Sequence, residues 1–377
     1  MPDLSAVPEG QFRDLMQPGR AIQAKAATLS TGGAVSNTGL ALHKLGVPVR
    51  LIGKIGDDLF GRAIQEILGD VAPRLVSDLA VDPSGETSYT IILNPPGFDR
   101  TFIHSQGVNN TFYASDLPRA TLEKADLFHF GYPSLMRSIY RGGGGELVMI
   151  LRRARRAGLT TSLDFSLPDP TSPAGEVDWP ELLANVLPFV DLFLPSVAEL
   201  IFLLRREEFD RISRDQEAIF IEAATPELLE ELSSVVMDYG VKVVMVKCGE
   251  RGIYLRTAEE SSWRKGGRGL DGLDATWHER QLWVSAFKVN LQGTTGAGDA
   301  AIAGFLSTIL QGKAPEDALI MAAAAGACSV EGVDSISGLR SWEAIVSRVK
   351  GGWETLPLGL DTEGWRKDEA YGLWKKT

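Results

Sequence analysis

The stretch that decides the fold is Gly293-Thr294-Thr295-Gly296-Ala297-Gly298-Asp299-Ala300. It runs directly into apolar residues at helical spacing, namely Ile302, Phe305, Leu306 and Ile309. The pattern predicts a helix whose N-terminus is preceded by small residues. Gly296, Ala297 and Gly298 can turn backbone N–H groups toward a ligand without obstruction by side chains, and the positive end of the helix dipole lies at the same place. The stretch therefore predicts an anion-binding site.

Asp299 lies at the edge of this predicted anion site. A carboxylate in that position can take a proton from an attacking hydroxyl while the amides stabilise a phosphoryl group in transfer. A simple helix cap with an acidic first turn would explain a lone Gly-Asp pair, but not the whole string. We therefore expect phosphoryl transfer with Asp299 as the general base.

Other sequence motifs for nucleotide, metal or acyl chemistry are not matched. The chain has no G-x-x-x-x-G-K-[ST] string and no G-x-S-x-G string. A G-x-G-x-x-G match at Gly267, Gly269 and Gly272 lacks the preceding strand and following apolar helix that a dinucleotide site requires. The four histidines are scattered and show no zinc spacing with the two cysteines.

Strand and helix patterns alternate along most of the chain, which is typical of an α/β domain with a largely parallel sheet. Predicted strands are 49–52, 126–130, 160–163, 191–194 and 242–246, and predicted helices include 37–45, 146–157 and 226–237. A β-rich run from Thr87 to His104 passes through Pro95-Pro96-Gly97 and predicts a hairpin outside this core.

The glycine-rich stretch resembles the C-terminal signature of the ribokinase-like (PfkB) carbohydrate kinase family, D-T-x-G-A-G-D. Gly32-Gly33-Ala34-Val35-Ser36-Asn37 is similar to the family's sugar-contacting segment G-G-x-x-x-N, and the segment 51–58 with Gly61 extends the likeness. The resemblance covers the chain from about Asp3 to Gly338. It implies a ribokinase-like α/β fold, with a mostly parallel central sheet flanked by helices and a small β lid.

The resemblance also implies an acceptor site, made by Asp3, Gly32, Gly33, Asn37 and Lys54. Asp3 precedes Gly32 at a spacing near that of the family's sugar-binding aspartate. Paired glycines let backbone amides approach hydroxyl groups, and Asn37 offers both a donor and an acceptor. A glycine turn before a helix, capped by the asparagine, is the alternative interpretation of this segment.

For the nucleotide, the resemblance points to the turn that contains Lys247, Gly249 and Gly252, and to Thr294. The segment from Pro195 to Glu199 is similar to the family's N-x-x-E motif, so Glu199 would organise waters around a magnesium ion. A carboxylate at a helix start is the alternative interpretation. The implied cofactors are ATP and Mg²⁺, with a monovalent cation left open.

The chain departs from the family pattern at four positions. Gly293 replaces the first Asp of the signature and Ser196 replaces the Asn of N-x-x-E. Ser166 and Pro168 stand where a D-x-N-x-R pattern starting at Asp164 would have Asn and Arg. These departures keep open a catalytically silent protein that senses sugars or nucleotides.

A nucleoside kinase is the second alternative to a sugar kinase, because the resemblance also embraces such enzymes. Phe112 and Tyr132 would then belong to an aromatic sandwich around a base. The expected organisation in all these cases is one kinase domain over 1–340, with lid segments at about 11–30 and 86–109. Residues 341–377 are expected to form a C-terminal extension packed on that domain.

The amino-acid composition and net charge limit the kinds of molecule that the protein is expected to bind. The chain has 377 residues and a formal net charge of −11, which repels phosphate backbones and argues against nucleic-acid or anionic-membrane partners. The longest apolar stretch, 318–330, is too short to cross a bilayer, and no signal peptide is visible. Cys248 and Cys328 lie in apolar runs and favour buried free thiols. We expect a cytoplasmic enzyme with a small-molecule sugar substrate, and the lid leaves open a homodimer.

Overall fold

The computed structural model describes residues 1–4, 18–19, 21–95, 101–213, 217–263 and 266–377. Backbone contacts divide the chain into two compact units. The smaller unit comprises residues 1–31 and 52–112, and the larger comprises 32–51 and 113–377. The predicted glycine-rich stretch and the Gly32–Asn37 segment therefore belong to the same unit. Residues 52–112, which lie between these two segments in the sequence, belong to the smaller unit.

An eight-stranded sheet with the order β11-β12-β10-β9-β8-β7-β6-β5 is the centre of the larger unit. Its strands are β5 (Leu127–Phe130), β6 (Thr160–Leu163), β7 (Leu192–Phe193), β8 (Val243–Lys247), β9 (Ile253–Thr257), β10 (Gln281–Val284), β11 (Trp365–Asp368) and β12 (Leu373–Lys376). Strands β5 to β8 are parallel to their neighbours. The pairs from β8 to β11 are antiparallel.

This architecture confirms the predicted α/β class with a large sheet flanked by helices. The sheet is mixed rather than mostly parallel, because β8 and β9 are joined by the tight turn 248–252, which reverses the chain without a helical crossover. Strand β6 has the predicted bounds, and β5, β7 and β8 differ from the predictions by one or two residues.

The strand predicted at 49–52 is wrong in position. Strand β1 spans Ile52–Gly56 and belongs to the smaller unit. Its partner β2 (Asp78–Asp82) begins with Asp78 opposite Ile52, so residues 49–51 have no partner strand among the described residues. A sequence pattern cannot reveal where the partner strand begins.

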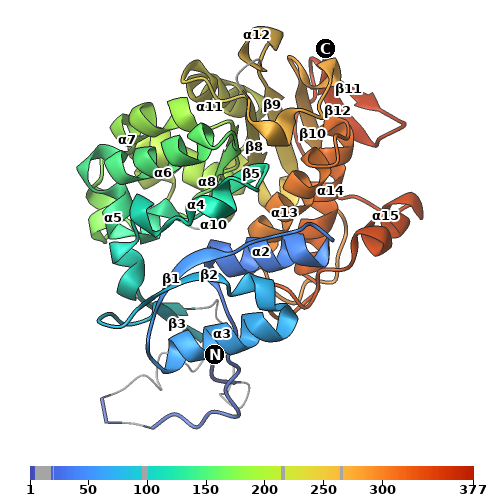
Figure 1. Ribbon diagram of the computed structural model, residues 1–377. Coiled ribbons are helices and arrows are strands. Elements are labelled where there is room, and N and C mark those ends of the chain that lie inside the picture. The colour runs from blue at the N-terminus through green and yellow to red at the C-terminus, as the bar shows by residue number, and fades with distance from the viewer. Residues whose placement is uncertain (5–17, 20, 96–100, 214–216, 264–265) are drawn as a thin grey trace. The chain divides into compact units, whose positions relative to one another are not determined.

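Helices α6, α7, α8 and α11 lie on one side of the large sheet, and α13 and α14 lie on the other (Figure 1). None of the helices in the described ranges is both long and apolar enough to span a bilayer. The helices of the larger unit are α2 (Gly33–Lys44), α4 (Arg119–Leu122), α5 (Arg137–Tyr140), α6 (Gly145–Arg156), α7 (Trp179–Val186), α8 (Val197–Leu204), α9 (Arg206–Ile212), α10 (Glu217–Ala223), α11 (Pro226–Asp238), α12 (Glu260–Trp263), α13 (Ala297–Ile309), α14 (Pro315–Ser329) and α15 (Trp342–Lys350).

Helix α13 is held by close packing against α14 and α2. A Cβ atom at Gly304 of α13 would lie 2.6 Å from the Met321 carbonyl oxygen of α14, so only glycine allows this approach. Helix α2 packs along the other side of α13. Two neighbouring helices therefore fix the N-terminus of α13, where the predicted anion site lies.

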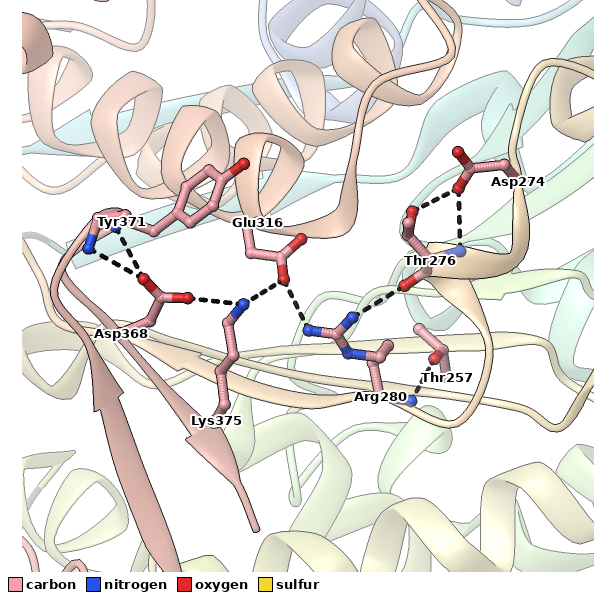
Figure 2. Close-up of polar contacts among 9 residues, drawn as sticks. Thr257, Asp274, Thr276, Arg280, Glu316, Asp368, Tyr371 and Lys375 are labelled. Atoms are coloured by element: carbon pink, nitrogen blue, oxygen red, sulfur yellow. Dashed lines mark hydrogen bonds and ion pairs between the residues drawn. The ribbon is translucent and has the colours of Figure 1, made fainter.

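The C-terminal extension predicted for 341–377 contains helix α15 and two further strands. Strands β11 and β12 are part of the large sheet, since Leu282 and Trp283 of β10 pair with β12. Lys375 of β12 contacts Glu316 of α14 at 2.7 Å and Asp368 of β11 at 2.7 Å (Figure 2). Strand β12 is thus held by an ion pair with helix α14 as well as by its pairing with β10.

In the smaller unit, β1 and β2 form a parallel pair next to α3 (Leu59–Val71). The predicted hairpin is confirmed as β3 (Tyr89–Leu93) and β4 (Thr101–Ser105), which pair antiparallel in a sheet of their own. Residues 11–17, 20 and 96–100 of the predicted lid segments lie outside the described residues. The function of the hairpin as a lid stays a prediction.

Candidate active site

The predicted anion site is the N-terminus of α13. Gly296 caps this helix with φ +78°, and a Cβ there would lie 2.4 Å from Cβ of Ser335, so both backbone and space require glycine. The Ala297 N–H donates to the Thr294 carbonyl at 3.3 Å. The N–H groups of Gly298 and Asp299 have no acceptor in the described part of the chain. These are the donors that a helix N-terminus leaves for an anion.

Asp299 lies in the first turn of α13 and is 3 % exposed. Three side chains donate hydrogen bonds to its carboxylate. Thr38 Oγ1 donates to Oδ1 at 3.0 Å, and Asn37 Nδ2 and the Tyr132 hydroxyl donate to Oδ2 at 3.0 and 2.7 Å. Hydrogen bonds of this kind from three side chains hold the orientation of a carboxylate.

The side chain of Asn37, whose contact with the acceptor sugar stays a prediction, has two partners inside the protein. Its Nδ2 donates to Asp299, and its Oδ1 accepts a hydrogen bond from Ser335 Oγ at 2.9 Å. Both ends of the amide therefore have partners inside the protein, because α2 packs against α13 and brings Asn37 to the carboxylate. Asn37 is a positioning residue for Asp299 in this geometry.

Tyr132 follows β5 and has φ +58° and ψ +46°, the left-handed region that few non-glycine residues adopt. Burial raises the pKa of its hydroxyl well above 10, and the negative charge of Asp299 adds to this effect. Tyr132 therefore stays a hydrogen-bond donor at working pH. In the nucleoside alternative Tyr132 belongs to an aromatic sandwich, but here its hydroxyl is engaged by Asp299. Phe112 is buried in the smaller unit.

Lys247 ends β8 and forms a buried ion pair with Asp164, which follows β6, with 2.7 Å between Nζ and Oδ1. Burial raises the pKa of Asp164, and the adjacent Lys247 ammonium opposes this effect. Burial alone would lower the pKa of Lys247, but the carboxylates of Asp164 and Glu199 raise it above its ordinary value. A Cβ at Gly298 would lie 3.5 Å from Nζ of Lys247, so this ammonium is adjacent to the first turn of α13.

Glu199 lies in the first turn of α8, where it forms a capping box with Ser196. The Glu199 carboxylate accepts from the Ser196 N–H at 2.6 Å, and Ser196 Oγ accepts from the Glu199 N–H at 3.3 Å. Burial raises the pKa of Glu199. Glu199 is thus a carboxylate at a helix start, which is the alternative interpretation of its sequence motif. Its contact with waters around a magnesium ion stays a prediction.

The remaining predicted residues lie in three places. Gly249 and Gly252 shape the β8–β9 turn with φ +53° and +85°. Gly32 caps α2, and Gly33 has φ +74°. Asp3 and Lys54 belong to the smaller unit, where the Lys54 ammonium donates to the Thr111 carbonyl at 2.8 Å and pairs with Asp82.

The structure thus brings Asn37, Lys247 and Asp299 together with the glycines before α13. Three contributors were not predicted, namely Thr38, the Tyr132 hydroxyl and the Lys247–Asp164 pair. Asp164 follows β6 and Lys247 ends β8, two strands of the parallel half of the sheet that flank β7. The carboxyl ends of such strands are where α/β proteins place ligands. The location of Asp164 and Lys247 at strand ends is therefore the sequence signal that could have predicted the pair.

Comparison with known proteins gives the same family over nearly the whole chain. Residues 3–342 match the family model for pfkB family carbohydrate kinases. A probable fructokinase-7 of Arabidopsis thaliana is 25% identical over 336 residues, which cover 86% of this chain and 84% of the relative.

Solved structures show the same fold. The structure of Arabidopsis thaliana ribokinase complexed with ribose and ATP aligns with a TM-score of 0.66 and 20% identity, covering 89% of this chain and 92% of that one. The nucleoside kinase of Methanocaldococcus jannaschii aligns with a TM-score of 0.60 and 19% identity, covering 89% and 91%. With a helix N-terminus beside a buried carboxylate, and a family match over most of its length, this chain belongs to the pfkB family of carbohydrate kinases.

Proposed function

We propose that this carbohydrate kinase transfers the γ-phosphoryl group of ATP to a hydroxyl of a sugar, with Asp299 as the general base. The observation that carries the proposal is that one helical turn holds both the free amides of Gly298 and Asp299 and the buried Asp299 carboxylate. Amides that bind an anion and a carboxylate that accepts a proton are the two groups that this transfer needs side by side.

In the proposed reaction the acceptor hydroxyl donates to Asp299, which takes its proton as the oxygen attacks phosphorus. The amides at the start of α13 and the Lys247 ammonium stabilise the negative charge on the transferred group. Asn37 and Thr38 hold the carboxylate in place during this step. The phosphate bond to the leaving ADP breaks as the bond to the acceptor oxygen forms.

Mg²⁺ would neutralise charge on the nucleotide phosphates when bound. The described residues hold no group of three His, Cys, Asp or Glu side chains that could cage a metal. This fits a cation bound mainly by phosphate oxygens and water, as Mg²⁺ usually is. Glu199 would contact those waters, because Ser196 engages only one of its two carboxylate oxygens. The monovalent cation stays a prediction.

The two alternatives make different demands on the same site. A silent sensor needs the anion site but not a carboxylate with three donors, so the surroundings of Asp299 favour an enzyme. A nucleoside kinase needs an aromatic platform for a base, and the sandwich of Phe112 and Tyr132 stays a prediction. The cytoplasmic location, the absence of nucleic-acid and membrane partners, the lid and the lid-mediated homodimer stay predictions.

Release of ADP from MgATP, measured with a panel of ketoses, aldoses and nucleosides, tests the proposal. We expect ADP release above background with at least one sugar, such as fructose or ribose, and phosphate on a sugar hydroxyl by mass spectrometry. Turnover with nucleosides alone would establish the nucleoside alternative. Binding of ATP with no turnover on any acceptor would establish the sensor.

A further inference from the structure

The hydrogen bonds to Asp299 do not have equivalent surroundings. Those from Asn37 and Thr38 are buried, and both donors lie in the same turn of α2. The bond from Tyr132 is only partly buried, and its donor lies on an irregular connection after β5. The Tyr132 side of the carboxylate is therefore the side that an incoming molecule can reach.

The carboxylate oxygen on that side has no room for a further donor. Oδ2 accepts from Asn37 Nδ2 at 3.0 Å and from the Tyr132 hydroxyl at 2.7 Å. A carboxylate oxygen has about two lone-pair positions for hydrogen bonds. An acceptor hydroxyl that approaches Oδ2 must therefore replace one of these two donors, and Asn37 is also held by Ser335.

Tyr132 presents the same chemical group as the substrate that the base is proposed to serve. Its hydroxyl donates to the carboxylate at 2.7 Å, as an acceptor hydroxyl must before it loses its proton. The tyrosine cannot itself become the nucleophile at working pH, because burial and Asp299 hold its pKa well above 10. Its backbone is in the left-handed region, which costs energy for a side chain of this kind, so the surrounding structure holds the hydroxyl on Asp299.

We propose that the Tyr132 hydroxyl occupies on Asp299 the place of the acceptor hydroxyl, and leaves it only when the acceptor binds. This inference rests on the proposed function, since it requires Asp299 to be the base. Tyr132 then keeps the base from activating water when no acceptor is present. It is a positioning residue that favours a bound acceptor over water, and its effect is measured by the ATP hydrolysis that occurs without sugar.

The test is Tyr132→Phe, which removes the hydroxyl and keeps the ring. With MgATP alone, we expect ATP hydrolysis to rise about three- to tenfold, the size of one lost competing hydrogen bond. With fructose or ribose, we expect the KM of the acceptor to fall by a similar factor while kcat changes little. Tyr132→Asn should also raise hydrolysis, and asparagine tolerates the left-handed backbone if the phenylalanine variant folds poorly.

The matched control is Tyr254→Phe, which removes a hydroxyl hydrogen bond to Gln281 on the antiparallel half of the sheet. Its hydrolysis without sugar should equal that of the parent. An equal rise in both variants would overturn the inference, as would a fall in kcat for Tyr132→Phe with unchanged hydrolysis and KM. A sugar kinase that stays active in Asp299→Asn would instead refute the proposed function itself.

Discussion

Asn37 and Asp299 lie 262 residues apart in the chain, and their side chains meet, with Nδ2 donating to Oδ2 at 3.0 Å. The contact joins the sugar-site motif to the phosphoryl-transfer motif within one unit of the protein. It gives Asn37 a second candidate function, the support of the base, beside the predicted contact with the acceptor. The variants below separate these functions.

Asp299→Asn should lower turnover by about 10² to 10⁴, the usual contribution of a general base, and leave ATP binding nearly unchanged. The substitution removes the proton acceptor but keeps the backbone amides of α13. Steady-state ADP release and calorimetry of ATP binding measure the two effects. Asp317→Asn is the control, because Asp317 occupies the first turn of α14 and is exposed. Equal turnover in Asp299→Asn and the parent would refute Asp299 as the base.

Asn37→Ala should lower kcat by about tenfold, with a smaller change in the KM of the acceptor. The carboxylate of Asp299 loses one of its buried donors, and a lost buried hydrogen bond costs about 1 to 3 kcal/mol. Ser335→Ala removes only the bond to Asn37 Oδ1 and should have a weaker effect. If the acceptor KM rose while kcat stayed constant, Asn37 would contact the acceptor as its motif predicts.

Gly298→Val should weaken ATP binding by tenfold or more, whereas Gly298→Ala should weaken it less. The Cβ atom that alanine adds fits at this position, because it would lie 3.5 Å from Lys247 Nζ, an ordinary contact distance. The two further methyl groups of valine would displace the ammonium or cover the amides that bind the phosphate. Gly69→Val in α3 controls for valine in a helix, since nothing lies within 4 Å of its Cβ position. Calorimetry that gave the parent affinity for Gly298→Val would exclude the anion site.

Glu316→Gln should lower the free energy of unfolding by about 1 to 3 kcal/mol at pH 7. Glu316 accepts from Lys375 of β12 and from Arg280, at 2.7 and 2.6 Å (Figure 2). Burial alone would raise the pKa of Glu316, but the neighbouring cations, chiefly Lys375, lower it below the ordinary value of 4.5. The exposed Glu354, which pairs with Lys288, gives the control Glu354→Gln, with little expected change.

The stabilisation by Glu316 depends on pH with a definite sign. A carboxyl group whose pKa is lowered by folding stabilises the protein above its unfolded pKa, and the effect disappears as pH falls through the folded pKa. The difference between parent and Glu316→Gln in urea unfolding should therefore be full at pH 7 and shrink below about pH 4.5. A difference that stayed constant down to the most acidic pH would show that packing, not charge, anchors β12.

Much of the fold was predictable because local sequence patterns indicate individual strands and turns. The short strand patterns at 160–163 and 242–246 predicted β6 and β8, and the Pro-Pro-Gly turn predicted the β3–β4 hairpin. The antiparallel half of the sheet was not predicted, because β11 and β12 are short and rich in charge, and they become strands only when β12 pairs with β10 and β11 pairs with β12. Register and partner depend on chain segments that are distant in sequence.

The sequence by itself determined the chemistry at the start of α13. Gly296 permits its left-handed cap, the small residues leave the amides accessible, and Asp299 brings the carboxylate, all within one helical turn. Only the tertiary structure decided what surrounds that carboxylate. Thr38, Tyr132 and Asn37 reach Asp299 because α2 packs against α13 and β5 ends beside them. Hydrogen bonds between residues so far apart in the sequence form only after the helices and the sheet have packed. A local sequence pattern therefore cannot predict them.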